Sequence, residues 1–296
     1  MYTNYFMVDE DFLAEFLESE RTKIADVVYG LYLRCGGKTS KKLSMEKYFS
    51  STRTRYPVVY FFCPKCKKAG FLPRLSGKKS ARELKYCPFC GEPNICYRFE
   101  TGRKKIIGML QISKMLEHDL AELAKYQNQQ LIVLICSVLE VYLREFYADI
   151  LNAKFVMHNE TLYDKFLRDC KNDFLNPGKT QDRLKRELGI NYKGIVGGDV
   201  FKILQALACS RNVIVHNNGI CDDTFIKQYP EIELRAELAP KCQSVEGYLQ
   251  IVDFTINKLD EIYRQAILKS AIGQIKYEVI LSNIDAYIPS QEERKI

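Results

Sequence analysis

The chain has 296 residues, a hydrophobic content of 47%, a charged content of 27% and a formal net charge of +7. This composition is typical of a globular protein with about two domains. No apolar run reaches the roughly 18 residues that a membrane helix needs, and residues 1–10 lack the basic start and apolar core of a signal peptide. We therefore expect neither a membrane segment nor an export signal.

The eleven cysteines favour a metal site over a disulfide framework. Four of them form two C-x-x-C pairs, whereas the other seven are scattered and odd in number. Disulfides persist in oxidising compartments, and nothing in the sequence predicts export. We expect a cytoplasmic protein, in a reducing cytosol, with one metal site and several buried thiols.

The positive charge is concentrated in one part of the chain. Residues 38–105 contain eighteen Lys and Arg against four acids, a local charge of +14, whereas residues 1–37 sum to −4 and residues 106–296 to −3. Four thiolates around one zinc ion would remove about two units of that charge. The remaining excess indicates either a polyanion partner or a surface that only confers solubility.

Residues 1–55 are expected to form a helix followed by a basic connector. Apolar residues recur at helical spacing through residues 8–34, and acidic residues lie at the start of this stretch. A Gly-Gly pair then ends the pattern, and a Ser/Thr-rich basic stretch occupies residues 38–55.

Residues 56–102 change to short β-rich runs that are broken by Pro and Gly. Residues 58–62 and 70–75 flank the first cysteine pair, and residues 82–86 and 95–99 flank the second. Two strand-and-turn units of this kind predict a small zinc ribbon.

Residues 103–270 are expected to form a helical domain, and residues 271–296 a C-terminal tail whose structure the pattern leaves open. The expected helices span residues 106–126, 129–155, 164–174, 180–188, 199–217 and 245–268. Asp199 is the expected N-cap of the fifth helix, and Gly219 its stop. The predicted fold class is thus mainly α, with a helical bundle preceded by the zinc ribbon and an N-terminal helix.

Cys63, Cys66, Cys87 and Cys90 are the predicted metal ligands. Two residues separate the cysteines of each pair, and twenty residues separate the pairs. This spacing matches sites in which each pair supplies two thiolates to a tetrahedral Zn²⁺. Four protein ligands leave no position for water, so a structural ion is expected. A redox C-x-x-C motif and buried free thiols are the alternatives, and Cys96 is the residue most easily mistaken for a ligand.

Aromatic residues alternate with Lys and Arg through the same ribbon region. This mixture suits the stacking of RNA bases beside phosphate contacts. The alternative is that the aromatic side chains fill the core of a small domain while the charges are only solvated.

The segment from Arg211 to Ile220 places Arg, Asn and His near the end of an apolar helix. Arginine binds phosphate bidentately, and histidine is suited to proton transfer near neutral pH. On a helix, Asn212 and His216 lie about 40° apart, whereas Arg211 lies about 140° from His216. Its side chain must therefore curl back, or the helix must loosen. These residues suggest phosphodiester chemistry; alternatively, they are helix caps and a surface ion pair.

The pattern Arg211-Asn212-x-x-x-His216-Asn217 resembles the R-N-x-x-x-H motif of HEPN-domain ribonucleases. In these all-α proteins the motif lies on a helix late in the domain. The apolar helix that contains residues 137–144, and the long helix after the motif, are similar to the arrangement in that family. The resemblance covers roughly residues 106–270 and does not include residues 1–100.

The resemblance implies a metal-independent endoribonuclease that leaves 2′,3′-cyclic phosphate and 5′-OH ends on RNA. His216 would act as general acid or base, Arg211 would stabilise the phosphorane-like negative charge, and Asn212 would orient the phosphate or His216. Glu140 is a candidate for a further polar member of the site; alternatively, it is only an exposed residue of its helix. The resemblance also implies a homodimer with two motifs in one cleft. A toxin or antiviral defence role, with a neutralising or activating protein partner, is implied as well.

Two other functions fit the sequence. One is a non-catalytic zinc-ribbon protein that binds nucleic acid or acts as an adaptor through a dimerising helical domain. The other is a DNA-binding regulator, although no helix-turn-helix pattern is present. A metal-dependent nuclease is disfavoured because His118 and His158 stand apart from clustered acids. Nucleotide hydrolysis is disfavoured because residues 194–198 lack the Lys and Ser/Thr of a phosphate-binding loop.

Overall fold

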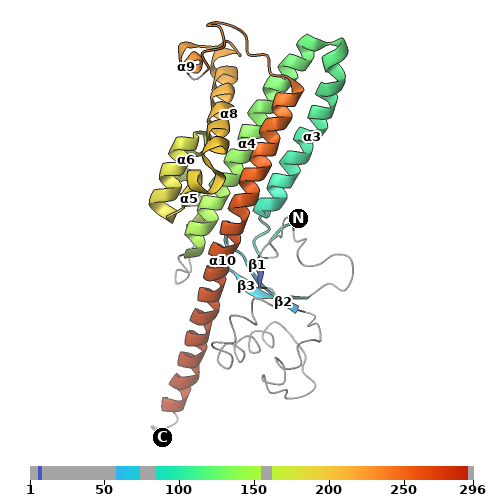
Figure 1. The fold of residues 1–296 in the computed structure, drawn as a ribbon. Helices are drawn as coiled ribbons and strands as arrows, with labels where there is room; N and C mark the ends of the chain where they lie inside the picture. Colours follow the sequence, from blue (N-terminus) through green and yellow to red (C-terminus); the bar gives the residue numbers. More distant parts are fainter. Residues whose placement is uncertain are drawn as a thin grey trace. The chain divides into compact units, whose positions relative to one another are not determined.

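The computed structural model describes residues 6–8, 58–73, 85–87, 89–154, 162–227 and 229–292. Most of the described residues are helical (Figure 1), which confirms the prediction of a mainly α protein. The predicted N-terminal helix and its basic connector lie outside the described residues, except for Val8, which belongs to a strand.

The chain divides into two compact units. The first comprises Met1–Asn94, Asp149–Tyr163 and Arg264–Ile296, and the second comprises Ile95–Ala148 and Asp164–Tyr263.

The first unit contains a three-stranded antiparallel sheet. Its strands are β1 (Phe6–Val8), β2 (Val58–Phe62) and β3 (Ala69–Pro73), in the order β1-β2-β3. The register pairs Phe62 with Ala69, so the turn between β2 and β3 contains the first cysteine pair. A bridge between Tyr86 and Pro93 encloses the second pair in a similar way. The predicted strand at residues 58–62 is confirmed, and the one at residues 70–75 is confirmed up to Pro73, where the described range ends. Most of the predicted stretch at residues 82–86 lies outside the described residues.

The predicted strand at residues 95–99 is wrong, because helix α3 (Ile95–Asp119) begins there. Alternating large side chains at positions 95, 97 and 99 suggested a strand. The buried side chains instead follow helical spacing: Cys96 is buried whereas Tyr97 is only half-buried.

Helix α4 (Ala121–Lys154) follows α3 after a break at Leu120, not between residues 126 and 129 as predicted. The polar run at residues 127–130 suggested the break, but two of its side chains make buried contacts. Asn128 accepts a hydrogen bond from Ser113 at 2.6 Å and donates to the Pro240 carbonyl at 2.9 Å. Gln129 donates to the Leu238 carbonyl at 2.7 Å. Tertiary contacts thus keep this polar stretch helical.

Short elements then connect α4 to the helix that contains the motif. They are α5 (Tyr163–Asp169), η2 (Asp173–Leu175), α6 (Pro177–Arg183), η3 (Leu184–Leu188) and α7 (Tyr192–Val196). Helix α8 (Gly198–Asn217) begins after Gly197, whose φ of 91° separates it from α7. The predicted N-cap, Asp199, therefore lies one position inside the helix, where its negative charge still favours the N-terminus.

Helix α9 (Asp223–Ile226) and a loop lead to the last helix, α10 (Cys242–Glu292). Helix α10 includes the predicted helix at residues 245–268 and continues through most of the tail. One face of its first half is apolar and buried, because Leu249, Val252, Ile256 and Leu259 are all buried. None of the helices in the described ranges combines the length and hydrophobicity needed to cross a membrane.

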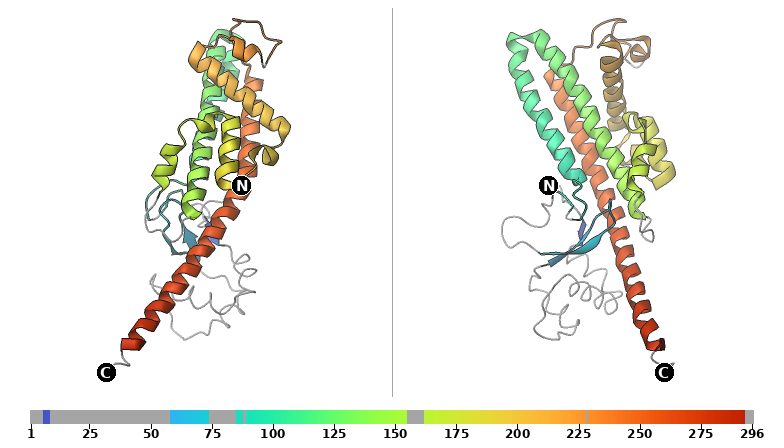
Figure 2. Two further views of the ribbon diagram at one scale, coloured as in Figure 1. Left: turned by 90° about the vertical axis from the view of Figure 1, so that its left-hand side faces the viewer. Right: turned by 180° about the vertical axis from the view of Figure 1, so that it is seen from behind.

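The core of the second unit lies where α3, α4 and the first half of α10 run side by side, with α8 along α4 (Figures 1 and 2). Aromatic rings join these helices. The ring centroids of Tyr142 and Phe146 on α4 are 6.3 Å apart, and Phe146 lies 5.9 Å from Tyr263 on α10. Buried aromatic surface of this size makes a large contribution to stability and fixes the helices that flank the motif.

Candidate active and metal sites

The four predicted metal ligands lie close together in the first unit. The Sγ atoms of Cys63 and Cys90 are 4.0 Å apart, those of Cys66 and Cys87 are 3.9 Å apart, and all four lie within 4.8 Å of one another. Sulfurs bound to zinc at about 2.3 Å would be about 3.8 Å apart at the corners of a tetrahedron, whereas a disulfide requires about 2.05 Å. The cluster is therefore compatible with a metal site.

The pKa values of the thiols in this cluster are shifted in opposite directions. Hydrogen bonds with Cys66 and Cys87, together with burial, raise the pKa of Cys63. Hydrogen bonds from Cys63 and Cys66 lower the pKa of Cys87. Sulfurs packed so closely cannot all ionise unless a cation balances their charge, which is what a bound metal ion supplies.

The two cysteine pairs have the same backbone geometry. The Lys67 N–H donates to the Cys63 carbonyl at 2.8 Å, and the Gly91 N–H donates to the Cys87 carbonyl at 2.9 Å. Lys67 and Gly91 occupy equivalent positions, and both have left-handed φ angles, 58° and 74°. Glycine adopts this conformation without strain, whereas lysine does so at a cost. Each pair thus forms a tight turn that presents two sulfurs to one point.

Asn152, near the end of α4, holds the first turn, and sequence analysis missed it. Its buried Nδ2 donates to the carbonyls of Pro64 and Lys65 at 2.7 and 2.8 Å, and its Oδ1 accepts from the Leu162 N–H at 2.9 Å. The Nζ of Lys65 lies 4.9 Å from the ring centre of Tyr163. No local pattern marks Asn152, because Pro64 lies 88 residues away in the sequence.

Cys96 does not join the cluster. It is buried in α3, and its Sγ donates to Oδ1 of the buried Asp260 on α10 at 3.4 Å. The C-x-x-C spacing therefore correctly distinguished the four clustered cysteines from Cys96, the cysteine nearest to them in the sequence.

Arg211, Asn212 and His216 lie in the last turns of α8. The helix ends where Asn218 and Gly219 adopt left-handed φ angles of 50° and 82°, as the predicted stop at Gly219 requires. Val213 is buried against a small cluster of apolar side chains, which anchors this end of the helix. Asn212 and His216 are exposed, so the motif faces outward.

The Arg211 side chain curls back to meet both other residues of the motif. Its Nη1 is 3.2 Å from Asn212 Oδ1 and 3.3 Å from His216 Nε2. A guanidinium group only donates, so His216 Nε2 must accept, which places the ring proton on Nδ1. The angular separation along the helix is thus overcome within one chain, and this contact needs no second copy.

Glu140 and Cys136, one turn apart on α4, lie within electrostatic range of Arg211. Burial raises the pKa of the Glu140 carboxyl, and the charges of Arg144 and Arg211 oppose that rise. Burial also raises the pKa of Cys136 to about 12, again against the charge of Arg211. Cys136 Sγ donates to the Leu207 carbonyl at 3.7 Å, which brings this part of α4 against α8.

We expect Glu140→Gln to raise the melting temperature near neutral pH. Burial raises the pKa of Glu140 in the folded state above its value in the unfolded chain. The contribution of the Glu140 carboxyl to the free energy of unfolding is therefore fully present below the pKa of the unfolded chain, and it is lost as the pH rises through the pKa of the folded protein. Glutamine avoids that loss. The gain over wild type should therefore vanish below the ordinary glutamate pKa of about 4.3. Thermal unfolding of wild type and Glu140→Gln, at neutral pH and below the ordinary glutamate pKa, measures the difference in melting temperature. The same difference at both pH values would contradict this account.

His118, the other histidine among the described residues, makes its contact outside the motif. His118 is exposed at the end of α3, where its Nδ1 lies 2.6 Å from Asp119 Oδ1. His158 lies outside the described residues.

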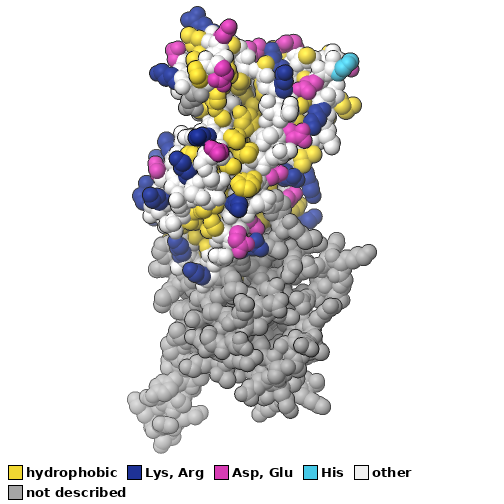
Figure 3. Space-filling model, in the orientation of Figure 1, with side chains coloured by type: hydrophobic (Ala, Val, Ile, Leu, Met, Phe, Trp, Pro, Cys, Tyr) yellow, Lys and Arg dark blue, Asp and Glu magenta, His cyan; other side chains and the backbone are white. Residues whose placement is uncertain are grey.

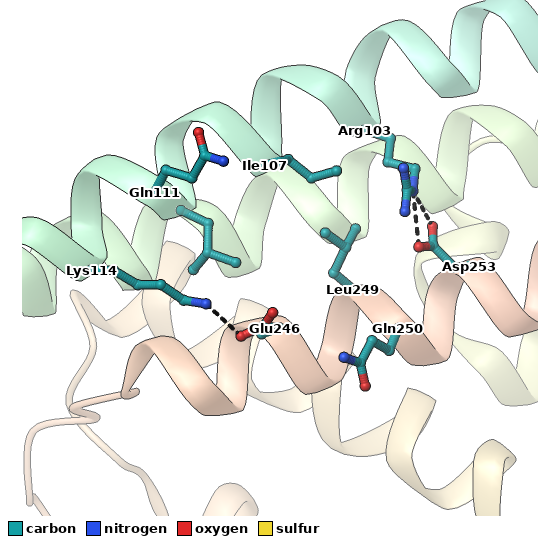
Figure 4. Close-up of a pocket in the computed structure, with 9 residues that line it drawn as sticks. Arg103, Ile107, Gln111, Lys114, Glu246, Leu249, Gln250 and Asp253 are labelled. Carbon is teal, nitrogen blue, oxygen red and sulfur yellow. Dashed lines mark hydrogen bonds and ion pairs between the residues drawn. The ribbon is translucent and has the colours of Figure 1, made fainter.

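A shallow groove lies between α3 and α10 in the second unit (Figure 4). Arg103 pairs with Asp253 at one end and Lys114 with Glu246 at the other, both at 2.7–2.9 Å. Apolar side chains, including Leu249, lie between the two ion pairs. The two ion pairs engage charged side chains at both ends of the groove, and as contacts between α3 and α10 they fix the register of the two helices.

Comparison of the chain with protein-family models, with curated proteins and with solved structures gives no match. A functional proposal for this chain must therefore be built on the motif of α8, the cysteine cluster and the resemblance of the motif to HEPN ribonucleases.

Proposed function

We propose that this protein is a metal-independent endoribonuclease of the HEPN type, with Arg211, Asn212 and His216 as its catalytic residues. The contact of one guanidinium with both Asn212 and His216, on an exposed helix end, is the observation that carries the proposal. A phosphate that enters this site would take the guanidinium as its partner and free His216 Nε2. The same event would thus bind the substrate and release the base.

The reaction begins when the ribose 2′-OH attacks the adjacent phosphorus. The O2′–P bond forms and the P–O5′ bond breaks, while His216 Nε2 accepts the proton of the 2′-OH. The 5′ oxygen takes its proton from water or from the protonated His216 of a second copy. Arg211 stabilises the charge that develops on the phosphoryl oxygens, and Asn212 orients the phosphate.

Surface charge supports RNA as the substrate. Lys and Arg side chains gather over α5 and α6 on the face drawn in Figure 3, and Lys179 of α6 is exposed. Basic surface of this kind attracts the phosphate backbone without regard to sequence.

A homodimer and a structural zinc ion complete the proposal. Leu134 and Val141 on α4, with Ile203 and Val215 on α8, are exposed apolar side chains that a second copy would cover. Zn²⁺ suits four thiolates at the observed separations better than the hard cations do. A place in a toxin or antiviral defence system, with a neutralising or activating partner, follows from the family resemblance alone.

The decisive experiment is cleavage of end-labelled RNA without added divalent ions, followed by analysis of the new ends. We expect 2′,3′-cyclic phosphate and 5′-OH ends, and no cleavage by His216→Ala. A single 2′-deoxy substitution at the mapped cleavage position should block scission there. Cleavage at that deoxy position, or 3′-OH ends, would overturn the mechanism. A folded, zinc-loaded dimer that binds RNA and never cuts it would favour the non-catalytic alternative.

A further inference from the structure

The two cysteine turns, equivalent in backbone, differ sharply in exposure. In the first, Cys63 is buried, and the side chain between the cysteines, Lys65, is only 4% exposed. Asn152 binds two carbonyls of this turn, and Lys65 lies over the ring of Tyr163. The first turn is therefore packed into the unit through Cys63 and Lys65.

The second turn presents its aromatic residues outward. Tyr86, just before Cys87, is 53% exposed, and Phe89, between the two cysteines, is 41% exposed. Lys85 and Cys90 are exposed beside them. The Phe89 N–H donates to Cys87 Sγ at 3.4 Å, so the cluster itself fixes the backbone that carries this ring.

Exposed aromatic rings on a rigid turn are suited to base stacking. Rings with about half of their surface exposed can still bury apolar area against a ligand, so they mark a candidate contact surface. Unpaired bases offer both faces for stacking, whereas duplex bases are already stacked on one another. Lys85 adds a phosphate contact, and the net charge of +14 in residues 38–105 favours a polyanion over a neutral partner.

We propose that Tyr86 and Phe89 of the second cysteine turn form a stacking platform for unpaired RNA, while the first turn serves only to hold the metal cluster in the fold. This inference rests on the proposed RNA substrate. It assigns RNA capture to a part of the chain that is separate from the residues that cut.

The test uses the full-length, zinc-loaded protein with His216→Ala, so that RNA is bound without being cut. Fluorescence anisotropy measures its affinity for an unstructured RNA and for an RNA duplex of the same length. Replacing both rings by alanine (Tyr86→Ala with Phe89→Ala) should weaken binding of the unpaired RNA at least about tenfold, since each stacked base contributes about 1–3 kcal/mol. Exchanging the rings (Tyr86→Phe with Phe89→Tyr) should keep affinity within about twofold of the parent.

A matched control is available elsewhere in the chain. Tyr126 and Phe254 are 51% and 40% exposed, close to the values for the two rings of the platform. Alanine at both positions should leave RNA affinity unchanged. The zinc content of every variant is measured first, and a platform variant that loses zinc is replaced by Tyr86→Leu with Phe89→Leu, which keeps apolar bulk without the rings.

Several outcomes would overturn the platform: unchanged affinity in the zinc-loaded variant, an equal loss in the control, equal affinity for the duplex, or no RNA binding by the parent. RNA cleavage by the wild-type protein together with any of these would refute the platform and leave the ribonuclease proposal intact. Tenfold weaker binding in a protein that never cleaves RNA would support the platform and refute the catalytic proposal.

Discussion

Arg211→Ala is expected to lower kcat/KM for RNA cleavage by about 10²–10³, the loss typical when one donor to a developing oxyanion is removed. Arg211 Nη1 contacts Asn212 Oδ1 at 3.2 Å and His216 Nε2 at 3.3 Å, so the substitution removes the phosphate clamp and the group that positions both partners. Arg211→Lys should recover only part of the loss, because an ammonium group cannot reproduce the planar fork of a guanidinium.

The same substitution at Arg186 provides the control. Arg186 lies on η3, its side chain is mostly exposed, and it pairs with Glu187 at 2.7 Å, away from the motif residues in the sequence. Arg186→Ala should change kcat/KM by less than about threefold, the effect of a surface charge on encounter. Initial rates on a single labelled RNA measure both variants. Full activity in Arg211→Ala, with melting temperature unchanged, would remove Arg211 from the mechanism.

Helices α8 and α10 were predictable because their buried faces repeat every three to four residues. Helix α10 is the clearest example, since Leu249, Val252, Ile256 and Leu259 are all buried as the periodicity requires. The predicted helices at residues 164–174 and 180–188 instead form the shorter elements α5, η2, α6 and η3. The errors arose where local and tertiary signals disagree. The polar run at residues 127–130 is compatible with a loop in isolation, and only its partners Ser113, Leu238 and Pro240 show why it stays helical.

The candidate sites were predictable to different depths. The cysteine cluster was predictable from spacing, because each C-x-x-C turn presents two sulfurs to one point. The contact of Arg211 with His216 depends on one rotamer, which periodicity does not specify. The role of Asn152 could not be predicted, because an isolated buried asparagine has no sequence signature and its hydrogen-bond partners are far away in the sequence.

Loss of one cysteine ligand should abolish stoichiometric metal binding, whereas loss of its nearest competitor should not. We expect wild type and Cys96→Ser to hold about one zinc ion per chain, and Cys87→Ser to hold far less. The Sγ of Cys87 lies 3.9 Å from that of Cys66 within the cluster, whereas Cys96 lies in α3 with its Sγ against Asp260. Serine at position 96 preserves a donor to that carboxylate, so the control removes a thiol and keeps this hydrogen bond.

The loss of metal should also be visible in the backbone of both turns. Structural zinc contributes about 10–16 kcal/mol in small zinc modules, so these turns are not expected to persist without it. The amide protons of Lys67 and Gly91, which donate to the carbonyls of Cys63 and Cys87, should exchange much faster in Cys87→Ser than in Cys96→Ser. Helix α8 should keep its protection, because its core is built from Phe201, Leu204 and Leu207. Metal analysis with hydrogen exchange on the three proteins decides the matter. Slow exchange at both turns in metal-free Cys87→Ser would mean that the four cysteines pack as free thiols and that no metal is needed to hold them.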